Sequence, residues 1–185
     1  QEVTLVELAD RLLSTALDRT ACEMVRRVFV EQGVDALTGV QVTSLDGCEG
    51  SNDLWAATLS TGESIACDSA FVTIGIRPRI DLVSGTEIKT GRGVLVDRQM
   101  RTNVPNEYAA GDIAEAHDPL VGECRVVPIL PNAYIGGRVA GLNMCGKTAD
   151  YNLGMSVNSV SFFGQPIMSA GFAGQEEGDG FQVLK

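Results

Sequence analysis

The chain has 185 residues, of which 44% are hydrophobic and 21% are charged, a balance that is typical of a globular protein with a buried core. Asp and Glu outnumber Lys and Arg by 24 to 14, so the net charge is −10 and no basic cluster is available to neutralise phosphates. We therefore expect no nucleic-acid partner. We also expect no membrane partner, because no apolar run approaches the roughly 18 residues of a membrane span.

The cysteines are spread along the chain without a C-x-x-C pair or a cluster of metal ligands, so no metal site is expected. Such a set is typical of reduced thiols in a cytoplasmic protein, where each thiol serves as a small hydrophobic side chain. The N-terminus has no signal peptide and starts on Gln1 inside an apparent strand, so we expect a segment of a longer protein. The five cysteines are Cys22, Cys48, Cys67, Cys124 and Cys145.

The first predicted elements are a strand and a helix. The run EVTLVEL indicates a largely buried strand that ends on Glu7. Within Thr15 to Gln32 apolar residues recur every three or four positions, which predicts an amphipathic helix. Gly33 is suited to end that helix.

From Val40 the apolar period changes to two, which predicts strands. Asp46-Gly47 and Thr61-Gly62 are expected turns between them, so the strands would form an antiparallel meander. The third strand would continue through the apolar run FVTIGIRP until Gly75 and Pro78 end it. The three strand candidates are GVQVTSL, LWAATLS and SIACDSAFVTIG.

The second half alternates short strands with one helix, which places the chain in the α/β class. GVLVD and NEYAAGD are expected strands, and the proline-rich run HDPLVGECRVVPILP is an expected loop. Asn132 to Gly146 is predicted to be helical. A pair of strands broken at Gly164-Gln165-Pro166 follows, and QEEGDGFQVLK begins a further strand.

Glu7 closes a strand before a helix, which is the position of the acidic residue that binds ribose hydroxyls in a dinucleotide-binding unit. The accompanying glycine-rich loop should lie about 20 residues upstream, yet only six residues precede Glu7. A solvated strand end is therefore an open alternative. If Glu7 does bind ribose, its carboxylate would repel a 2′-phosphate and favour NAD over NADP, although Arg11 lies nearby.

Small residues narrow the NEYAAGD strand just before a carboxylate. Gly111 would let the backbone approach a ligand, and Asp112 at the carboxyl end of the strand could accept hydrogen bonds from a polyol chain. A helix cap or turn aspartate is the alternative for Asp112. Gly75 could likewise admit a ligand or simply form a strand-to-loop corner.

The helix that begins near Asn132 exposes free N–H groups with partial positive charge in its first turn, which suits an anion. Gly136 and Gly137 lie in its interior, where each costs roughly 1 kcal/mol relative to Ala. Close approach of another backbone or of a ligand could explain both glycines, and we favour core packing against a neighbouring helix.

Taken together, these motifs resemble the later half of the pyridine nucleotide-disulfide oxidoreductase family of FAD- and NAD(P)H-dependent flavoproteins. TNVPNEYAAGD resembles the second FAD motif of the family, and EVTLVE resembles the second strand of its NAD(P) half. The meander is similar to the β-insertion of that half. SFFGQPIMSAGFAG resembles the opening of the interface domain, and the nearest subfamilies are NADH oxidases, coenzyme A-disulfide reductases and rubredoxin reductases.

The resemblance implies roles for particular residues. Asp112 would bind the ribityl chain of FAD, and Gly111 would permit its approach. Glu7 would bind the ribose of NADH, the favoured nicotinamide cofactor, and Gly75 would line the nicotinamide-nucleotide site. Backbone groups around three residues at the helix start would face the isoalloxazine: Ile129, Leu130 and Ala133.

The resemblance also implies a division of the chain. Residues 1–103 would belong to an incomplete Rossmann-like NAD(P)-binding domain, 104–150 to the FAD-binding domain and 151–185 to the start of an α+β interface domain. The parent enzyme would pass hydride from NADH to FAD and on to an unknown acceptor. The glycine-rich loops and any redox-active cysteine pair are absent from this chain, so no catalytic residue is assigned.

Two further hypotheses accompany this interpretation. A non-catalytic structural or assembly module could retain the flavin motif as scaffold. Exposed sheet edges would also favour a homo-oligomer in which copies of the chain exchange terminal strands.

Overall fold

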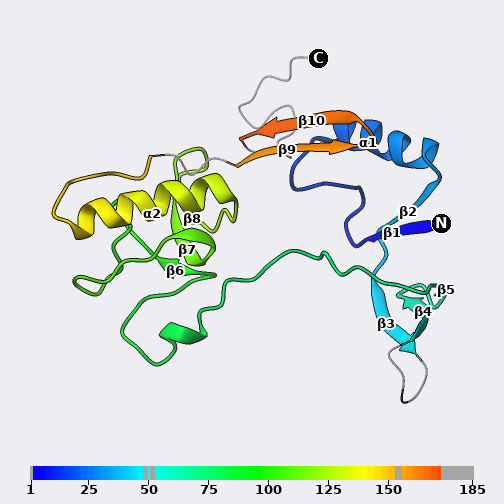
Figure 1. The fold of residues 1–185 in the computed structure, drawn as a ribbon, viewed down its shortest axis with the longest axis horizontal. Coiled ribbons are helices and arrows are strands. Elements are labelled where there is room, and N and C mark those ends of the chain that lie inside the picture. The colour runs from blue at the N-terminus through cyan, green and yellow to red at the C-terminus, as the bar shows by residue number, and fades with distance from the viewer. Residues whose placement is uncertain (1, 48–49, 51–52, 153–155, 172–185) are drawn as a thin grey trace. The chain divides into compact units, whose positions relative to one another are not determined.

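The computed structural model describes residues 2–47, 50, 53–152 and 156–171. The described residues fall into two compact units, each with its own apolar core (Figure 1). Unit 1 takes in the described residues of Gln1–Ile74 and Ser159–Ile167, and unit 2 takes in those of Gly75–Asn158 and Met168–Phe172. Every predicted site residue except Glu7 belongs to unit 2.

Unit 1 begins with a β–α–β arrangement. Strand β1 (Val3–Glu7) runs parallel to β2 (Val34–Thr38), and helix α1 (Arg19–Glu31) connects them. The register pairs Val3 with Val34 and Glu7 with Thr38. The predictions of β1 and α1 are confirmed, whereas β2 was not expected, since VDALT shows no clear period and becomes a strand by pairing with β1.

The ends of α1 follow from two residues. The Asp18 carboxylate accepts a hydrogen bond from the Ala21 N–H at 2.7 Å, so the helix begins at Arg19 rather than near Thr15. Gly33 adopts φ +78° and ends the helix as predicted.

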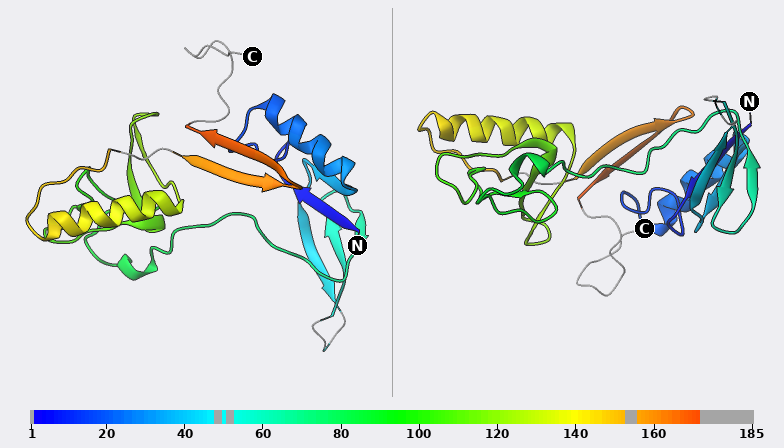
Figure 2. Two further views of the ribbon diagram at one scale, coloured as in Figure 1. Left: turned by 45° about the horizontal axis from the view of Figure 1, so that its top comes forward. Right: turned by 90° about the horizontal axis from the view of Figure 1, so that it is seen from below.

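The core of unit 1 lies under α1. Leu17, Cys22 and Val25 are buried there, and Phe162 and Ile167, from a hairpin that spans Val157 to Ala170, pack against them. Figure 2 shows this hairpin beside α1. Strand β1 is less buried than predicted. Val3 is 51% exposed, because in the described part of the chain β1 pairs with β2 alone.

The cysteines differ in their surroundings. Cys22 is a buried small hydrophobe, as expected, but the same expectation is wrong for Cys124 and Cys145, whose side chains are exposed on the surface. All four cysteines in the described part of the chain are free thiols, and Cys48 lies outside the described residues.

The predicted meander is present as an antiparallel sheet of β3 (Val42–Gly47), β4 (Leu54–Leu59) and β5 (Ser64–Ala66). Gly62, at φ +88°, turns the chain between β4 and β5 as expected. The expected turn at Asp46-Gly47 is wrong, because both residues are paired within β3.

The third strand of the meander stops at Ala66. The Cys67 N–H still donates to the Trp55 carbonyl at 3.1 Å, and residues 68–80 form no strand. The prediction that FVTIGIRP forms an apolar strand is therefore wrong for this chain. Phe71 is 92% exposed and Ile74 is 93% exposed. An apolar run becomes a strand only where a neighbouring strand takes its hydrogen bonds, and none of the described residues pairs with this run.

Unit 2 is built on a small mixed sheet. Strand β6 (Val94–Leu95) runs parallel to β7 (Ala114–Asp118), and β7 pairs antiparallel with β8 (Glu123–Arg125). The predicted GVLVD strand is thus shorter than expected. The expected loop over HDPLVGECRVVPILP is partly wrong, because its first part forms the β7–β8 hairpin.

Three helical elements complete unit 2. The 3₁₀ turns are η1 (Asp81–Val83) and η2 (Gly111–Ile113), and the long helix is α2 (Leu130–Met144). The prediction of α2 is confirmed, although Pro131 lies in its first turn rather than before it. Among the described residues, no helix is both long and apolar enough to cross a membrane.

The core of unit 2 lies between α2 and the sheet. Met100, which is 1% exposed, packs against α2 at Gly136, where an added Cβ would lie 3.2 Å from the Met100 Cε atom. An added Cβ on Gly137 would meet nothing. The packing role expected for both glycines is therefore confirmed for Gly136 and wrong for Gly137.

The described chain ends in the predicted pair of strands, β9 (Val157–Phe162) and β10 (Gln165–Ala170). Phe163 and Gly164 form the turn, both with positive φ, so the chain reverses one residue earlier than the expected break. The strand predicted within QEEGDGFQVLK lies outside the described residues.

Candidate cofactor-binding site

The AAGD motif forms a tight turn ahead of β7. Ala110 is extended, Gly111 then adopts φ +81°, and the chain enters η2. A residue with a Cβ is strained at that φ, which explains the glycine. The prediction that Asp112 ends a strand is wrong, since Asp112 lies within η2 and only Tyr108 of that segment pairs, through an isolated bridge.

The Asp112 side chain is exposed on this turn. Within the described parts of the chain, no hydrogen bond or ion pair involves its carboxylate, so it does not serve as the helix cap considered above. The carboxylate is therefore free to accept hydrogen bonds from a ligand.

The first turn of α2 lies beside the AAGD turn. An added Cβ on Gly111 would be 3.8 Å from the Ala133 Cβ, in ordinary contact. Ile129 occupies the N-cap position with an extended backbone, and no side chain caps the helix. Leu130 is 82% exposed. The positive end of the helix dipole and its free N–H groups therefore lie next to Gly111.

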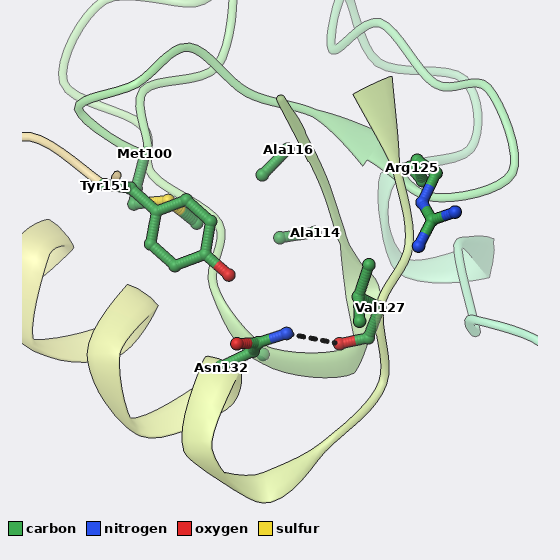
Figure 3. A pocket seen from close by; sticks show the side chains of 8 residues that line it. Met100, Ala114, Ala116, Arg125, Val127, Asn132 and Tyr151 are labelled. Atoms are coloured by element: carbon green, nitrogen blue, oxygen red, sulfur yellow. Dashed lines mark hydrogen bonds between the residues drawn. The ribbon is translucent and has the colours of Figure 1, made fainter. Parts of the chain in front are cut away.

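A small pocket lies behind this turn, with room for about one water molecule rather than a cofactor (Figure 3). The Asn132 amide, in the first turn of α2, donates to the Val127 carbonyl at 3.4 Å across the pocket. The Tyr151 hydroxyl points toward Asn132 in the same view. The lining residues are Met100, Gly111, Ala114, Ala116, Arg125, Val127, Asn132 and Tyr151.

Beside the pocket lies a buried ion pair that the sequence patterns did not reveal. The Arg125 Nε atom is 3.0 Å from the Asp118 carboxylate, which is 2% exposed and also accepts the Leu120 N–H at 2.9 Å. Burial raises the pKa of the nearby Tyr151 hydroxyl, and the Asp118 charge raises it further. The sequence predicted only a loop over HDPLVGECRVVPILP, so the pairing across the β7–β8 hairpin had no signal in the sequence.

Glu7 lies at the end of β1 in unit 1, as predicted. Its Oε1 atom accepts the Ala9 N–H at 2.8 Å, which orients the side chain over the loop that follows β1. Oε2 makes no hydrogen bond within the described chain and can accept one from a ligand hydroxyl.

Gly75 is the first residue of unit 2 and has φ +91° in an exposed extended segment. Positive φ explains the glycine, and no atom lies within 4 Å of an added Cβ. The structure thus brings Gly111, Asp112 and Ala133 together in unit 2, with Ile129 and Leu130 at the adjoining helix start.

The family model for pyridine nucleotide-disulphide oxidoreductases matches residues 1–137. The chain belongs to this family. It is 33% identical to the NADH-dependent phenylglyoxylate dehydrogenase subunit epsilon of Aromatoleum evansii, over 95% of this chain and 41% of that subunit. It is 30% identical to the rubredoxin-NAD(+) reductase of Pseudomonas putida, over 80% of this chain and 38% of that reductase.

Two solved structures have the same fold as this chain. The NAD-dependent persulfide reductase of A. fulgidus has a TM-score of 0.82 and 28% identity, over 88% of this chain and 30% of its own. The water-forming NADH oxidase of Lactobacillus brevis, bound to NADH, has a TM-score of 0.85 and 24% identity, over 94% of this chain and 38% of its own. The chain therefore spans well under half the length of these relatives.

Proposed function

We propose that this chain is the part of an FAD-dependent NADH oxidoreductase that binds the flavin ribityl chain and one ribose of NADH. The proposal depends chiefly on one observation, the exposed carboxylate of Asp112. It lies on the Gly111 turn, beside the first turn of α2. Family membership and the NADH-linked names of the relatives support it. The non-catalytic module has no comparable support.

The residues at this turn fit a flavin. Asp112 would accept hydrogen bonds from ribityl hydroxyls, and Gly111 would let the dinucleotide lie close to the backbone. Backbone groups of Ile129, Leu130 and Ala133 would face the isoalloxazine, where the helix dipole would stabilise negative charge. The bound flavin would supply the hydride-accepting chemistry, while the protein would supply orientation and electrostatics.

Glu7 fits the NADH ribose. With Oε1 held by the Ala9 N–H, Oε2 would accept a hydrogen bond from a ribose hydroxyl. Its negative charge would disfavour a 2′-phosphate and so favour NADH over NADPH. Gly75 would line the nicotinamide-nucleotide site.

The rest of the proposal concerns the whole protein. Residues 1–103 would serve the NAD(P)-binding domain, 104–150 the FAD-binding domain and 151–185 the interface domain. We further propose a cytoplasmic enzyme that forms a homo-oligomer, in which exposed sheet edges would allow strand exchange. The electron acceptor would be a disulfide, oxygen or a redox protein.

Flavin binding by Asp112→Asn in the full-length protein tests the proposal. The asparagine carbonyl still accepts a hydrogen bond, but a bond to a neutral group contributes about 0.5–1.5 kcal/mol instead of about 1.5–3, so the Kd for FAD should rise roughly fivefold to tenfold. Glu107→Gln is the matched control, because Glu107 is an exposed carboxylate in the preceding turn. An unchanged Kd for Asp112→Asn would refute the ribityl role.

A further inference from the structure

One carboxylate bridges two guanidinium groups in the loop that follows Glu7. The Asp10 Oδ1 atom is 2.8 Å from Arg11 Nη1, and the Asp10 Oδ2 atom is 3.1 Å from Arg19 Nη2. The Asp10 side chain is 57% exposed and that of Arg19 is 73% exposed. Asp10 therefore pairs with two cations at a surface that solutes can reach, and its single negative charge offsets one of their two positive charges.

The two arginines are held there by different means. Arg11 is only 26% exposed, and although burial raises the pKa of the Cys22 thiol on α1, the charge of Arg11 acts to lower that pKa by a smaller amount. Its Nε atom is buried and makes no hydrogen bond within the described chain. Arg19 is the first residue of α1 and extends into solvent. Both guanidinium groups therefore meet at Asp10 in the loop between β1 and α1, which Glu7 begins.

We propose that Asp10 is a specificity-determining residue, which excludes a 2′-phosphorylated nucleotide by occupying Arg11 and Arg19. This inference rests on the proposed binding of the NADH ribose at Glu7. A 2′-phosphate on that ribose would meet the Glu7 carboxylate and two cations already paired with Asp10, and these four groups together carry no net positive charge. Without the Asp10 charge, the same two guanidinium groups could pair with the phosphate, which Arg does with good geometry.

Because the ion pairs of Asp10 with Arg11 and Arg19 lie at the surface, Asp10 can affect nucleotide specificity without affecting the stability of the fold. Exposed ion pairs contribute only about 0–1 kcal/mol to folding, because water screens them and ordering long side chains costs entropy. Substitution of Asp10 should therefore leave the protein folded. Arg11 would remain largely buried and Arg19 would remain at the start of α1, so both would be available to a new anion.

The test compares two nucleotides on the full-length protein with Asp10→Asn. We expect the Kd for 2′,5′-ADP to fall about fivefold to tenfold at low salt, and the Kd for 5′-AMP to stay unchanged. The NADPH to NADH ratio of kcat/KM should rise by a similar factor. Both effects should shrink in 0.5 M salt, where the Debye length is only about 4 Å.

Two control variants sharpen the result. Glu31→Gln removes one negative charge from the opposite end of α1, roughly 18 Å from Arg19, and should change neither Kd. Adding Arg19→Gln to Asp10→Asn should reverse part of the gain for 2′,5′-ADP.

The outcomes distinguish the two proposals. If the unsubstituted protein binds neither 5′-AMP nor NADH, the nucleotide site itself is wrong and this inference falls with it. If both bind normally but Asp10→Asn leaves the Kd for 2′,5′-ADP unchanged, the role of Asp10 alone is overturned.

Discussion

The interior glycines of α2 offer a direct test of how the helix packs. Gly137 is exposed, and an added Cβ there would meet no atom within 4 Å. Gly136 is buried, and its added Cβ would lie 3.2 Å from Met100 Cε and 3.7 Å from Ala110 Cβ. The same substitution at adjacent positions should therefore have different effects.

The expected magnitudes follow from helix propensity and packing. Gly137→Ala should stabilise unit 2 by about 0.5–1 kcal/mol, because alanine orders the helix backbone at lower entropic cost. Gly136→Ala has the same backbone gain, but it must displace a Met100 side chain that is 1% exposed. Overpacking of this kind costs about 1–3 kcal/mol, so the net change should be zero to 2 kcal/mol of destabilisation.

Hydrogen exchange of the α2 amides under native conditions would measure both changes locally. Gly141→Ala serves as a control, since Gly141 is also exposed with open space at its Cβ and should behave like Gly137. Equal stabilisation by Gly136→Ala and Gly137→Ala would refute the packing of Met100 against α2.

Three other predictions concern the cores. Gly93→Ala would push its Cβ into the Ile113 carbonyl, so it should destabilise unit 2 by about 2 kcal/mol or more in urea unfolding. Asn143→Ala should cost about 2–4 kcal/mol by the same assay, because the buried amide joins α2 to two loop carbonyls. Burial raises the pKa of Cys22 above its ordinary 9.0 and that of Tyr151 above 10.0. The unfolded chain therefore loses these protons first, and stability should fall as pH rises above about 9, less steeply in Tyr151→Phe.

Elements with a strong local signal could be predicted from the sequence. The helical period predicted α1, the run that ends at Gly146 predicted α2, and the change to a period of two predicted the meander. The strand β2 could not be found in this way, because its strand conformation depends on pairing with β1. The run containing Phe71 and Ile74 shows the converse, since it has the pattern of a strand but no partner among the described residues.

Some residues of the candidate site could also be suggested from the sequence, and others could not. The AAGD motif suggested Gly111 and Asp112 as candidates, whereas Ala133 and its neighbours were suggested by the resemblance to the family. The sequence left a strand end, a helix cap and a turn open for Asp112, and it could not decide between them, because the turn depends on the positive φ of Gly111. The Asp118–Arg125 pair and Tyr151 could not be predicted either. They lie near one another only because the β7–β8 hairpin, α2 and the chain after α2 pack together.

The flavin content of the full-length protein tests the central claim most directly. The account predicts a flavin absorbance band near one FAD per chain after gel filtration, which NADH bleaches under anaerobic conditions. A full-length protein that elutes folded but without flavin, and gains none when incubated with excess FAD, would contradict the account.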